Sequence, residues 1–267
     1  MEPAHLTDRA VIAVAGPEAR DFLQGLITND IARLRPGAAI YSALLSPQGK
    51  ILFDFFITEG EGALLLDCAA AAQEALFKKL RLYRLRAKVE LEIRGQLGVY
   101  AGLAGAAAAR AVSFADPRHP ALPARGIGAL AEMPKGLAGP DAYHAVRLAQ
   151  GVPEGADFGV EKIFALDGGL DELHAVSFEK GCYVGQELTA RMKHRATARK
   201  RPHVVTADGT VPSPGTPVIA NGLEAGEIMA SYGTQGFALV RLDRIEGAQD
   251  FRADNIPVAL TRPAWLA

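Results

Sequence analysis

The order of strand-like and helical segments limits what this 267-residue chain can fold into. Four apolar, strand-like runs precede the first long helical pattern, at residues 9–15, 41–45, 51–58 and 63–67. The helical pattern covers residues 69–85, and two more strand-like runs follow it directly. Because strands and helices do not alternate strictly, a parallel sheet of strand–helix–strand units is disfavoured. The sequence predicts an α+β fold with antiparallel or mixed sheets.

The second half of the chain changes character twice. Prolines and glycines crowd residues 116–139, which predicts an irregular connection over the surface. After residue 201, short strand-like runs alternate with turns, a pattern typical of a small β-barrel or sandwich. We therefore expect an α+β domain over residues 1–200, either undivided or built from two sub-lobes at about 1–105 and 106–200, and a β-barrel domain over residues 201–267.

The overall composition is that of an ordinary globular protein, with 49% hydrophobic and 22% charged residues and a net charge of −1. No run approaches the roughly 20 apolar residues of a membrane span, so we expect no membrane partner. The first residues lack the basic region and apolar core of a signal peptide, and two cysteines suit a reducing compartment. These features predict a cytoplasmic protein.

Residues 180–187, Lys-Gly-Cys-Tyr-Val-Gly-Gln-Glu, form the most informative motif of the chain, and one of only two cysteines lies between its glycines. Downstream, apolar residues recur every four positions, as on one face of a helix: Val184, Leu188 and Met192. Cys182 is therefore expected at or near a helix N-terminus, where free N–H groups and the macrodipole favour a thiolate. Lys180 adds positive charge nearby.

The two cysteines are expected to differ. A free cysteine usually behaves as a small buried hydrophobe. Cys68 fits that role because it closes the apolar run at residues 63–67. Cys182 has Gly181 and Tyr183 as neighbours rather than aliphatic residues, which favours a chemical role.

Polar side chains of the predicted helix could serve the same site. Glu187 and Arg191 lie four residues apart with the acid first, which favours an ion pair, either at the surface or within the site. Gln186 lies four residues after the cysteine, so its amide can face the same solvent or ligand. Tyr183 offers a ring face and a hydroxyl group, or it packs against a neighbouring aromatic residue.

The motif at residues 180–187, continued by Leu-Thr-Ala-Arg to residue 191, resembles the signature of the YgfZ family of folate-binding iron–sulfur cluster assembly factors. That family is related to the T protein, the aminomethyltransferase of the glycine cleavage system. Two further segments are similar to the family's, residues 16–30 with Phe-Leu-Gln-Gly and Thr-Asn-Asp, and residues 147–155 with Arg-Leu-Ala-Gln-Gly-Val-Pro-Glu-Gly. The resemblance implies a folate-binding α+β body followed by a small β-barrel.

A folate site needs an apolar cleft, a carboxylate or amide for the polar edge of the pterin, and cations for the glutamate tail. The candidates in this chain are Asp54, Asn29, Tyr143, Arg147 and Tyr183. Asp54 lies among phenylalanines, so it either lines the cleft or sits on the solvent face of its strand. Tyr143 and Arg147 share one helix face, either at the ligand or in a plain structural contact.

The chain departs from the related aminomethyltransferases at two acids. Those proteins carry paired acids where this chain has Phe53 and Asp54, and a glutamate where Ala149 stands. Losing these carboxylates weakens the case for aminomethyl transfer and favours work with thiols or metal.

Two basic runs lie at residues 78–88 and 193–203. Each run is by default a solvated face, and we expect this for the first. The second directly follows the predicted helix after Cys182, so it could hold a folate tail, an acidic partner or RNA.

Together, the motif and the resemblance favour an accessory factor of iron–sulfur cluster assembly or repair that binds tetrahydrofolate or another folate derivative. A cluster needs several thiolates, so Cys182 is expected to bind a transient iron–sulfur cluster shared with a partner. The resemblance implies that this partner is an A-type carrier or a client iron–sulfur protein. One alternative is a folate-dependent one-carbon transferase, with Asp54 orienting the folate and Cys182 as nucleophile. Another is a tRNA-modification accessory that uses the basic run at 193–203.

Overall fold

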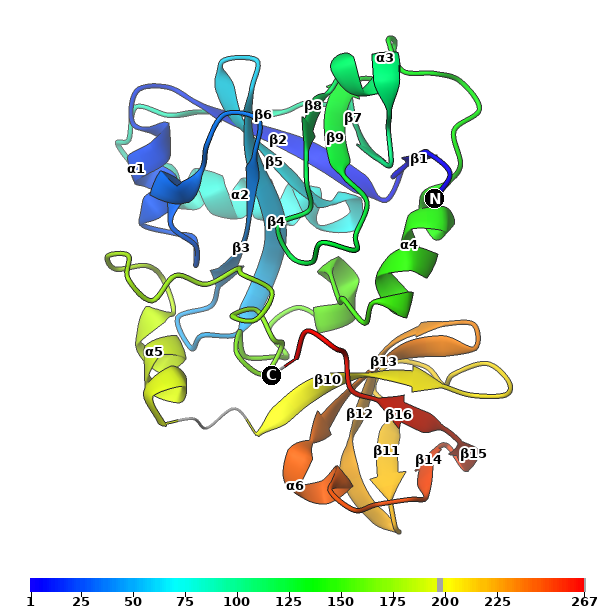
Figure 1. The fold of residues 1–267 in the computed structure, drawn as a ribbon. Helices are drawn as coiled ribbons and strands as arrows, with labels where there is room; N and C mark the ends of the chain where they lie inside the picture. The colour runs from blue at the N-terminus through cyan, green and yellow to red at the C-terminus, as the bar shows by residue number, and fades with distance from the viewer. Residues whose placement is uncertain (196–198, 267) are drawn as a thin grey trace.

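The computed structural model describes residues 1–195 and 199–266 of the chain. Three sheets and the helices packed on them make up the fold (Figure 1). All neighbouring strands within these sheets run antiparallel. The predicted α+β class is therefore confirmed.

The first sheet has five strands in the order β3-β4-β5-β2-β6. Their bounds are Arg9–Ala15 (β2), Ala39–Leu45 (β3), Ile51–Gly60 (β4), Ala63–Ala69 (β5) and Glu90–Ile93 (β6). A tight turn joins β3 to β4, and Gly49, with φ of 76°, supplies the left-handed backbone that this turn needs. Helices α1 (Ala19–Gln24) and α2 (Gln73–Arg84) lie near this sheet, and α2 buries Leu76 and Leu80 in its core.

The second sheet has four strands in the order β1-β7-β9-β8. Their bounds are Ala4–His5 (β1), Leu97–Ala101 (β7), Val112–Phe114 (β8) and Arg125–Ala129 (β9), and the short helix α3 (Gly105–Ala109) precedes β8. Strand β9 lies inside the stretch that was expected to be irregular, so that prediction was wrong there. The sequence pattern did not indicate a strand because β9 contains Gly126 and Gly128, and glycine is depleted in strands. At Gly128 the strand packs closely on its neighbours, since a Cβ there would lie 3.3 Å from Cβ of Ala111 and from the carbonyl oxygen of Arg110.

The third sheet has seven strands in the order β15-β14-β11-β12-β13-β10-β16 and curves into a nearly closed barrel. Their bounds are Lys200–Thr206 (β10), Pro217–Ala220 (β11), Leu223–Tyr232 (β12), Gln235–Arg241 (β13), Phe251–Ala253 (β14), Ile256–Pro257 (β15) and Ala259–Thr261 (β16), with helix α6 (Leu242–Ile245) after β13. Val205, Val218, Ile228 and Val240 are among the side chains that fill its interior. The division into domains stays a prediction, although β10 begins close to the expected boundary.

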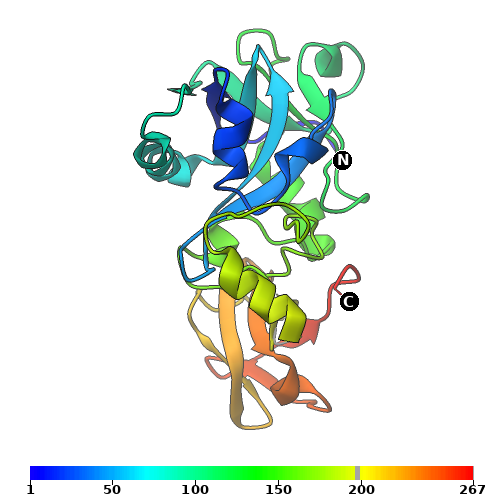
Figure 2. The same cartoon turned by 90° about the vertical axis from the view of Figure 1, so that its left-hand side faces the viewer.

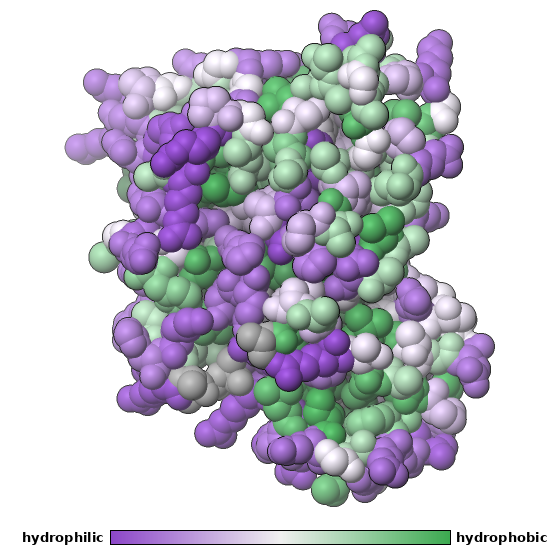
Figure 3. Space-filling view, viewed as in Figure 1, coloured by the Kyte–Doolittle hydropathy of each residue, from purple (hydrophilic) through white to green (hydrophobic). Residues whose placement is uncertain are grey.

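The body and the barrel share one hydrophobic core. Tyr41 and Phe56 of the first sheet belong to the same buried cluster as Phe237 and Leu239 of the barrel. Helices α4 (Pro140–Ala149) and α5 (Gln186–Arg195) and the 3-10 turn η3 (Gly155–Phe158) lie between the sheets, and Figure 2 shows α5 facing the viewer at their junction. On the face drawn in Figure 3, hydrophobic side chains gather over the barrel. Within the described ranges, no helix combines the length and the apolar character needed to cross a bilayer.

Candidate functional site

The motif cysteine lies in a loop, residues 181–185, which we call the signature loop. Helix α5 begins only at Gln186, four residues after Cys182. Gly185 has φ of 82°, a left-handed backbone that a right-handed helix does not contain, so the helix starts after it. The prediction of a cysteine at or near the helix N-terminus was therefore wrong. The macrodipole acts within about the first turn of a helix, and Cys182 lies outside α5.

Lys180 anchors the N-terminal side of the signature loop. Its side chain is buried, and Nζ donates hydrogen bonds to three backbone carbonyls, those of Gln24 at 2.6 Å, Ile27 at 2.6 Å and Asn29 at 3.0 Å. Burial lowers the pKa of Lys180 to about 8. The ammonium therefore points into the body rather than toward Cys182, unlike the nearby charge that the sequence suggested.

Asn29, a folate candidate, ties the segment before the signature loop to the first sheet. Its Nδ2 donates to the carbonyl oxygen of Tyr41 at 2.7 Å and to that of His174 at 2.8 Å. The side chain is 3% exposed, and both amide hydrogens are thus used inside the protein.

Tyr183 and Gly185 anchor the C-terminal side of the loop. Tyr183 belongs to the shared core, and burial raises the pKa of its hydroxyl to about 12. Gly185 rests on the β3–β4 turn so closely that a Cβ would lie 2.6 Å from the carbonyl oxygen of Ser46. Tyr183 therefore acts in packing here, and the second glycine of the motif is required by close approach.

Cys182 is exposed between these anchors. No atom lies within 4 Å of the Cβ position at the neighbouring Gly181, so the loop is open at this point. Cys68, by contrast, is 1% exposed on β5, and burial raises the pKa of its thiol to about 12. The predicted difference between the two cysteines is confirmed as a difference in access. An exposed sulfur on an anchored loop can be approached by a partner protein.

Gln186, Glu187 and Arg191 of the motif and its continuation do not make the contacts that the sequence suggested. Because Cys182 is outside the helix, Gln186 does not share a helix face with it. Gln186 instead lines a hollow of about 200 Å³ with Ser177, Phe178 and four other residues. Glu187 and Arg191 are both exposed on α5, and no ion pair joins them among the contacts that the structure describes.

A network of buried charges, which we call the buried charge network, lies between the first two sheets and α4. It contains Arg9, Asp67, Asp116, Arg118, Arg125, Tyr143 and Glu154. Glu154 accepts hydrogen bonds from Nη1 of Arg118 at 2.7 Å and from the hydroxyl of Tyr143 at 2.8 Å. Asp67 joins two guanidinium groups, those of Arg9 and Arg125, each at 2.6 Å.

Arginines surround the buried carboxylate of Glu154 in this network. Burial alone would raise the pKa of Glu154, but the guanidinium groups, with Arg118 the strongest, outweigh it and hold that pKa well below its usual range. Arg147, on the same face of α4 as Tyr143, pairs with Asp157 at 2.6 Å and donates to the hydroxyl of Tyr232 in the barrel at 2.8 Å. The polar groups of both folate candidates on α4 are therefore engaged within the protein.

Asp54 occupies a different environment, at the wall of a cavity. It is 4% exposed on β4, and it accepts hydrogen bonds from the Tyr41 hydroxyl at 2.8 Å and from the backbone N–H of Gly155 at 3.0 Å. Burial raises the pKa of Asp54, although Arg9 opposes the rise. The cavity has a volume of about 340 Å³ and is mainly apolar, with Leu52 and Val160 among its walls. None of its lining side chains is a lysine or arginine.

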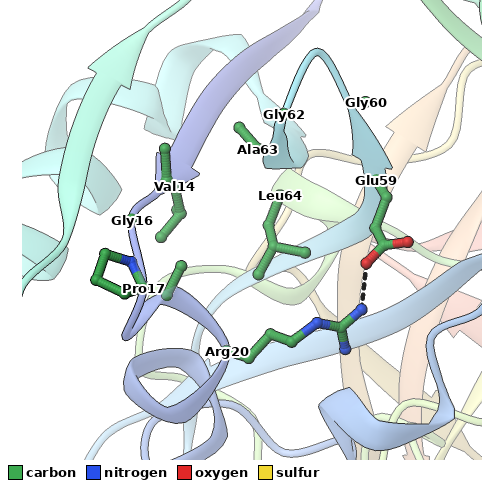
Figure 4. A pocket seen from close by; sticks show the side chains of 11 residues that line it. Val14, Gly16, Pro17, Arg20, Glu59, Gly60, Gly62, Ala63 and Leu64 are labelled. Atoms are coloured by element: carbon green, nitrogen blue, oxygen red, sulfur yellow. Dashed lines mark hydrogen bonds and ion pairs between the residues drawn. The ribbon is translucent and has the colours of Figure 1, made fainter.

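Another hollow, of about 500 Å³, lies where β2, α1 and the β4–β5 hairpin meet (Figure 4). An ion pair between Arg20 and Glu59 crosses it, and glycines 16, 60 and 62 line its rim. None of the predicted catalytic or folate-binding residues lines this hollow. The signature loop and the Asp54 cavity are therefore the two candidate functional features.

Sequence reasoning missed most of the buried charge network. Arg118 and Arg125 fell in the stretch expected to be irregular, and Glu154 was read only as part of a motif. Asp67 did carry a signal, because it interrupts an apolar strand in which an unpaired charge would be costly. Such a residue predicts a buried partner without identifying it.

Two family models match this chain. "GCVT N-terminal domain" matches residues 6–116, which hold the first sheet, and "CAF17, C-terminal beta-barrel domain" matches residues 199–267. Among solved structures, the chain is similar to the glycine cleavage system aminomethyltransferase T from Bartonella henselae, with a TM-score of 0.71 over 98% of this chain and 85% of that one. At 17% identity this likeness shows the fold alone.

Curated proteins give closer matches. "Iron-sulfur cluster assembly factor IBA57, mitochondrial" of Homo sapiens is 35% identical over 97% of this chain and 84% of that protein. The Mus musculus protein of the same name is 33% identical over the same shares, and the Neurospora crassa homolog is 32% identical over 94% of this chain and 61% of its own length.

These relatives are named as mitochondrial proteins, so the predicted cytoplasmic location is contradicted and was wrong. The cytoplasmic prediction failed because composition and cysteine count do not specify the compartment to which a protein is sent. The resemblance to the YgfZ family and to the T protein is confirmed by the matched domains and the shared fold. At this identity and coverage, the chain belongs to the family of iron–sulfur cluster assembly factors IBA57.

Proposed function

We propose that this protein is an accessory factor of iron–sulfur cluster assembly or repair, and that Cys182 binds a cluster shared with a partner. The observation that carries the proposal is the exposure of Cys182 on a loop anchored by Lys180, Tyr183 and Gly185. The names of the relatives support the same role. Because the loop is already ordered, little conformational entropy is lost when a partner docks there.

The chemistry at Cys182 is ligand exchange. The thiol releases its proton to solvent, and the sulfur donates an electron pair to iron in place of a weaker ligand. A cluster takes several thiolates, so the partner supplies the others. An A-type carrier or a client iron–sulfur protein is the class of partner that fits this division.

For folate, we place the pterin in the Asp54 cavity. Its volume of about 340 Å³ and its apolar walls suit a flat ring. Oδ2 of Asp54 already accepts from Tyr41 and Gly155, whereas Oδ1 accepts only from Gly155 and has a second lone pair for a pterin N–H. No cation lines the cavity, so the glutamate tail would extend beyond it. A bound tetrahydrofolate would supply a one-carbon carrier at this point.

Mixing the protein with a cluster-loaded A-type carrier tests the role of Cys182. The wild-type protein is expected to form a complex that retains the visible absorbance of the cluster, and Cys182→Ser is expected to lose it. Cys68→Ala is the matched control, because it removes the buried thiol and leaves the exposed one. Equal absorbance and equal complex formation by Cys182→Ser and the wild type would contradict the proposal.

Calorimetric titration with tetrahydrofolate tests the cavity. Asp54→Asn is expected to weaken binding roughly tenfold or more, as for the loss of one charge-assisted hydrogen bond. Glu59→Gln, which alters the hollow of Figure 4, is expected to bind as the wild type does. A wild-type protein that shows no binding, or an Asp54 variant that binds equally well, would rule out this site.

A folate-dependent one-carbon transferase remains a second candidate because the raised pKa of Asp54 suits proton transfer inside the cavity. Turnover of methylene-tetrahydrofolate that disappears in Asp54→Ala would support it. The tRNA-modification role is less favoured, since Lys193 and Arg201 of the second basic run already pair with Asp171 and Glu172. A steep salt dependence of RNA binding would revive it.

A further inference from the structure

The C-terminal end of α2 exposes leucines among cations. We call this surface the basic leucine end; its residues are Lys78, Lys79, Arg81, Leu82, Arg84, Leu85, Arg86 and Lys88. Leu82 is 66% exposed, and Leu85, at 85%, is the most exposed large hydrophobic residue in the described ranges. Figure 2 shows α2 at the margin of the body, away from the barrel.

Leu85 has an unusual backbone as well as an exposed side chain. Its φ of 45° and ψ of −109° place it at the first central position of a tight turn, closed by a 2.8 Å hydrogen bond from N of Ala87 to O of Arg84. That position of a type II′ turn favours glycine, because a Cβ is strained there. Leu85 therefore occupies a position at which glycine would relieve the backbone strain and would remove an exposed apolar side chain.

The leucines point away from the protein core. Leu76 and Leu80 form the buried side of α2, and Leu82 lies about 200° around the helix from Leu80. Lys78 precedes Leu82 by one turn, so cation and leucine share the outer face. This face is the one that an external surface would meet.

Six of the eight residues are lysine or arginine, in a chain whose net charge is −1. None of the six forms an ion pair with a carboxylate of the described residues. Lys79 and Arg81 instead lie over aromatic rings of the same helix, 5.6 Å from the ring centre of Tyr83 and 5.9 Å from that of Phe77. The positive charge of this end is thus left for an external anion.

We propose that the basic leucine end docks the protein on an anionic membrane surface. Leu82 and Leu85 would enter the boundary between headgroups and acyl chains, while the surrounding lysines and arginines bind lipid phosphates. The expectation of no membrane partner rested on the lack of a spanning segment, which a surface contact does not need. This inference goes beyond the proposed function, which requires only the signature loop and the cavity.

RNA is the other polyanion that this charge could attract. RNA-binding surfaces stack bases on exposed aromatic rings, but Phe77 and Tyr83 are half-buried, and the exposed side chains are aliphatic. Two protruding leucines therefore favour lipid over nucleic acid.

Vesicle flotation of the full chain tests the proposal, with phosphatidylcholine alone or mixed with phosphatidylglycerol. The wild type is expected to float with the anionic vesicles and not with the neutral ones. Arg81→Gln/Arg84→Gln should lower the bound fraction roughly tenfold, and raised salt should act in the same direction. Leu82→Ser/Leu85→Gly should lower it similarly without lowering the thermal midpoint, because glycine relieves the backbone at position 85.

Leu223→Ser and Arg252→Gln, both exposed on the barrel, are the matched controls and should float as the wild type does. Failure of the wild type to float with anionic vesicles, or unchanged flotation of both double variants, would overturn the proposal. A tRNA competitor separates the two polyanions. If tRNA binding is lost in the arginine variant and kept in the leucine variant, the surface serves nucleic acid and the membrane proposal fails.

Discussion

The two thiols of this chain lie in opposite surroundings. Cys182 is exposed on the signature loop, whereas Cys68 lies in the core of the first sheet with a pKa that burial raises to about 12. Iodoacetamide is therefore expected to modify Cys182 in the native protein and to reach Cys68 only after unfolding, because the thiolate is the reactive form. Peptide mass spectrometry over a time course measures this. Equal rates at the two sites would show that the first sheet opens readily or that the loop is closed.

Asp54 should make stability depend on pH in a definite direction. Burial raises its pKa in the folded protein above the ordinary value of 3.8, so the unfolded chain ionises first as the pH rises and is stabilised relative to the folded one. Asp54→Asn is therefore expected to raise the free energy of unfolding at neutral pH. This gain should be small near pH 4 and grow as the pH rises through the folded pKa.

Urea unfolding of both proteins across that pH range checks the sign. Glu154, whose pKa is held low by its arginines, is present in both proteins, so the comparison isolates the change at Asp54 together with its coupling to Glu154. A gain that shrinks with rising pH would mean that Asp54 is stabilised as a carboxylate by its neighbours.

At the scale of the element, the signature loop depends on its contact with the β3–β4 turn. Gly185→Ala places a Cβ 2.6 Å from the Ser46 carbonyl at a φ of 82°, and it is expected to cost about 1–3 kcal/mol of stability. Gly181→Ala is the matched control in the same loop, because nothing lies within 4 Å of its Cβ position. Chemical denaturation measures both changes, and equal effects would show that the loop is not docked as described.

The elements differ in how far the sequence could foretell them. The turn between β3 and β4 can be predicted from local sequence, because Ser46, Pro47 and Gly49 favour a turn backbone. Strand β9 cannot be, because its glycines pack against the segment just before β8, where a Cβ at Gly128 would lie 3.3 Å from Cβ of Ala111. The start of α5 was misjudged because the spacing of apolar residues continues through Gly185, whose backbone cannot join a helix.

The same limit applies to the candidate site. Cys182 and Asp54 stood out because their immediate neighbours are unusual for their residue types. Tyr143 and Arg147 could be placed on one helix face, but their partners Arg125 and Tyr232 come from strands β9 and β12. Contacts between residues so distant in sequence are decided by the three-dimensional packing, which local patterns do not encode.

At the scale of the whole molecule, the shared core should make the body and the barrel unfold together. Trp265, the single tryptophan, lies at the junction, where its Nε1 donates to the Gly151 carbonyl at 3.1 Å and its ring packs on Gly169. Tryptophan fluorescence and far-ultraviolet circular dichroism are therefore expected to give the same midpoint. Two separate midpoints would show that the barrel melts independently of the body.

The unequal exposure of the two cysteines also limits which disulfides can form when the protein is oxidised by air. Each molecule offers one accessible thiol, that of Cys182, and its second thiol is buried inside a sheet. Oxidation of a purified sample should therefore end at a disulfide-linked pair of chains and never proceed to longer polymers. A reducing agent would return that pair to single chains with the exposed thiol restored.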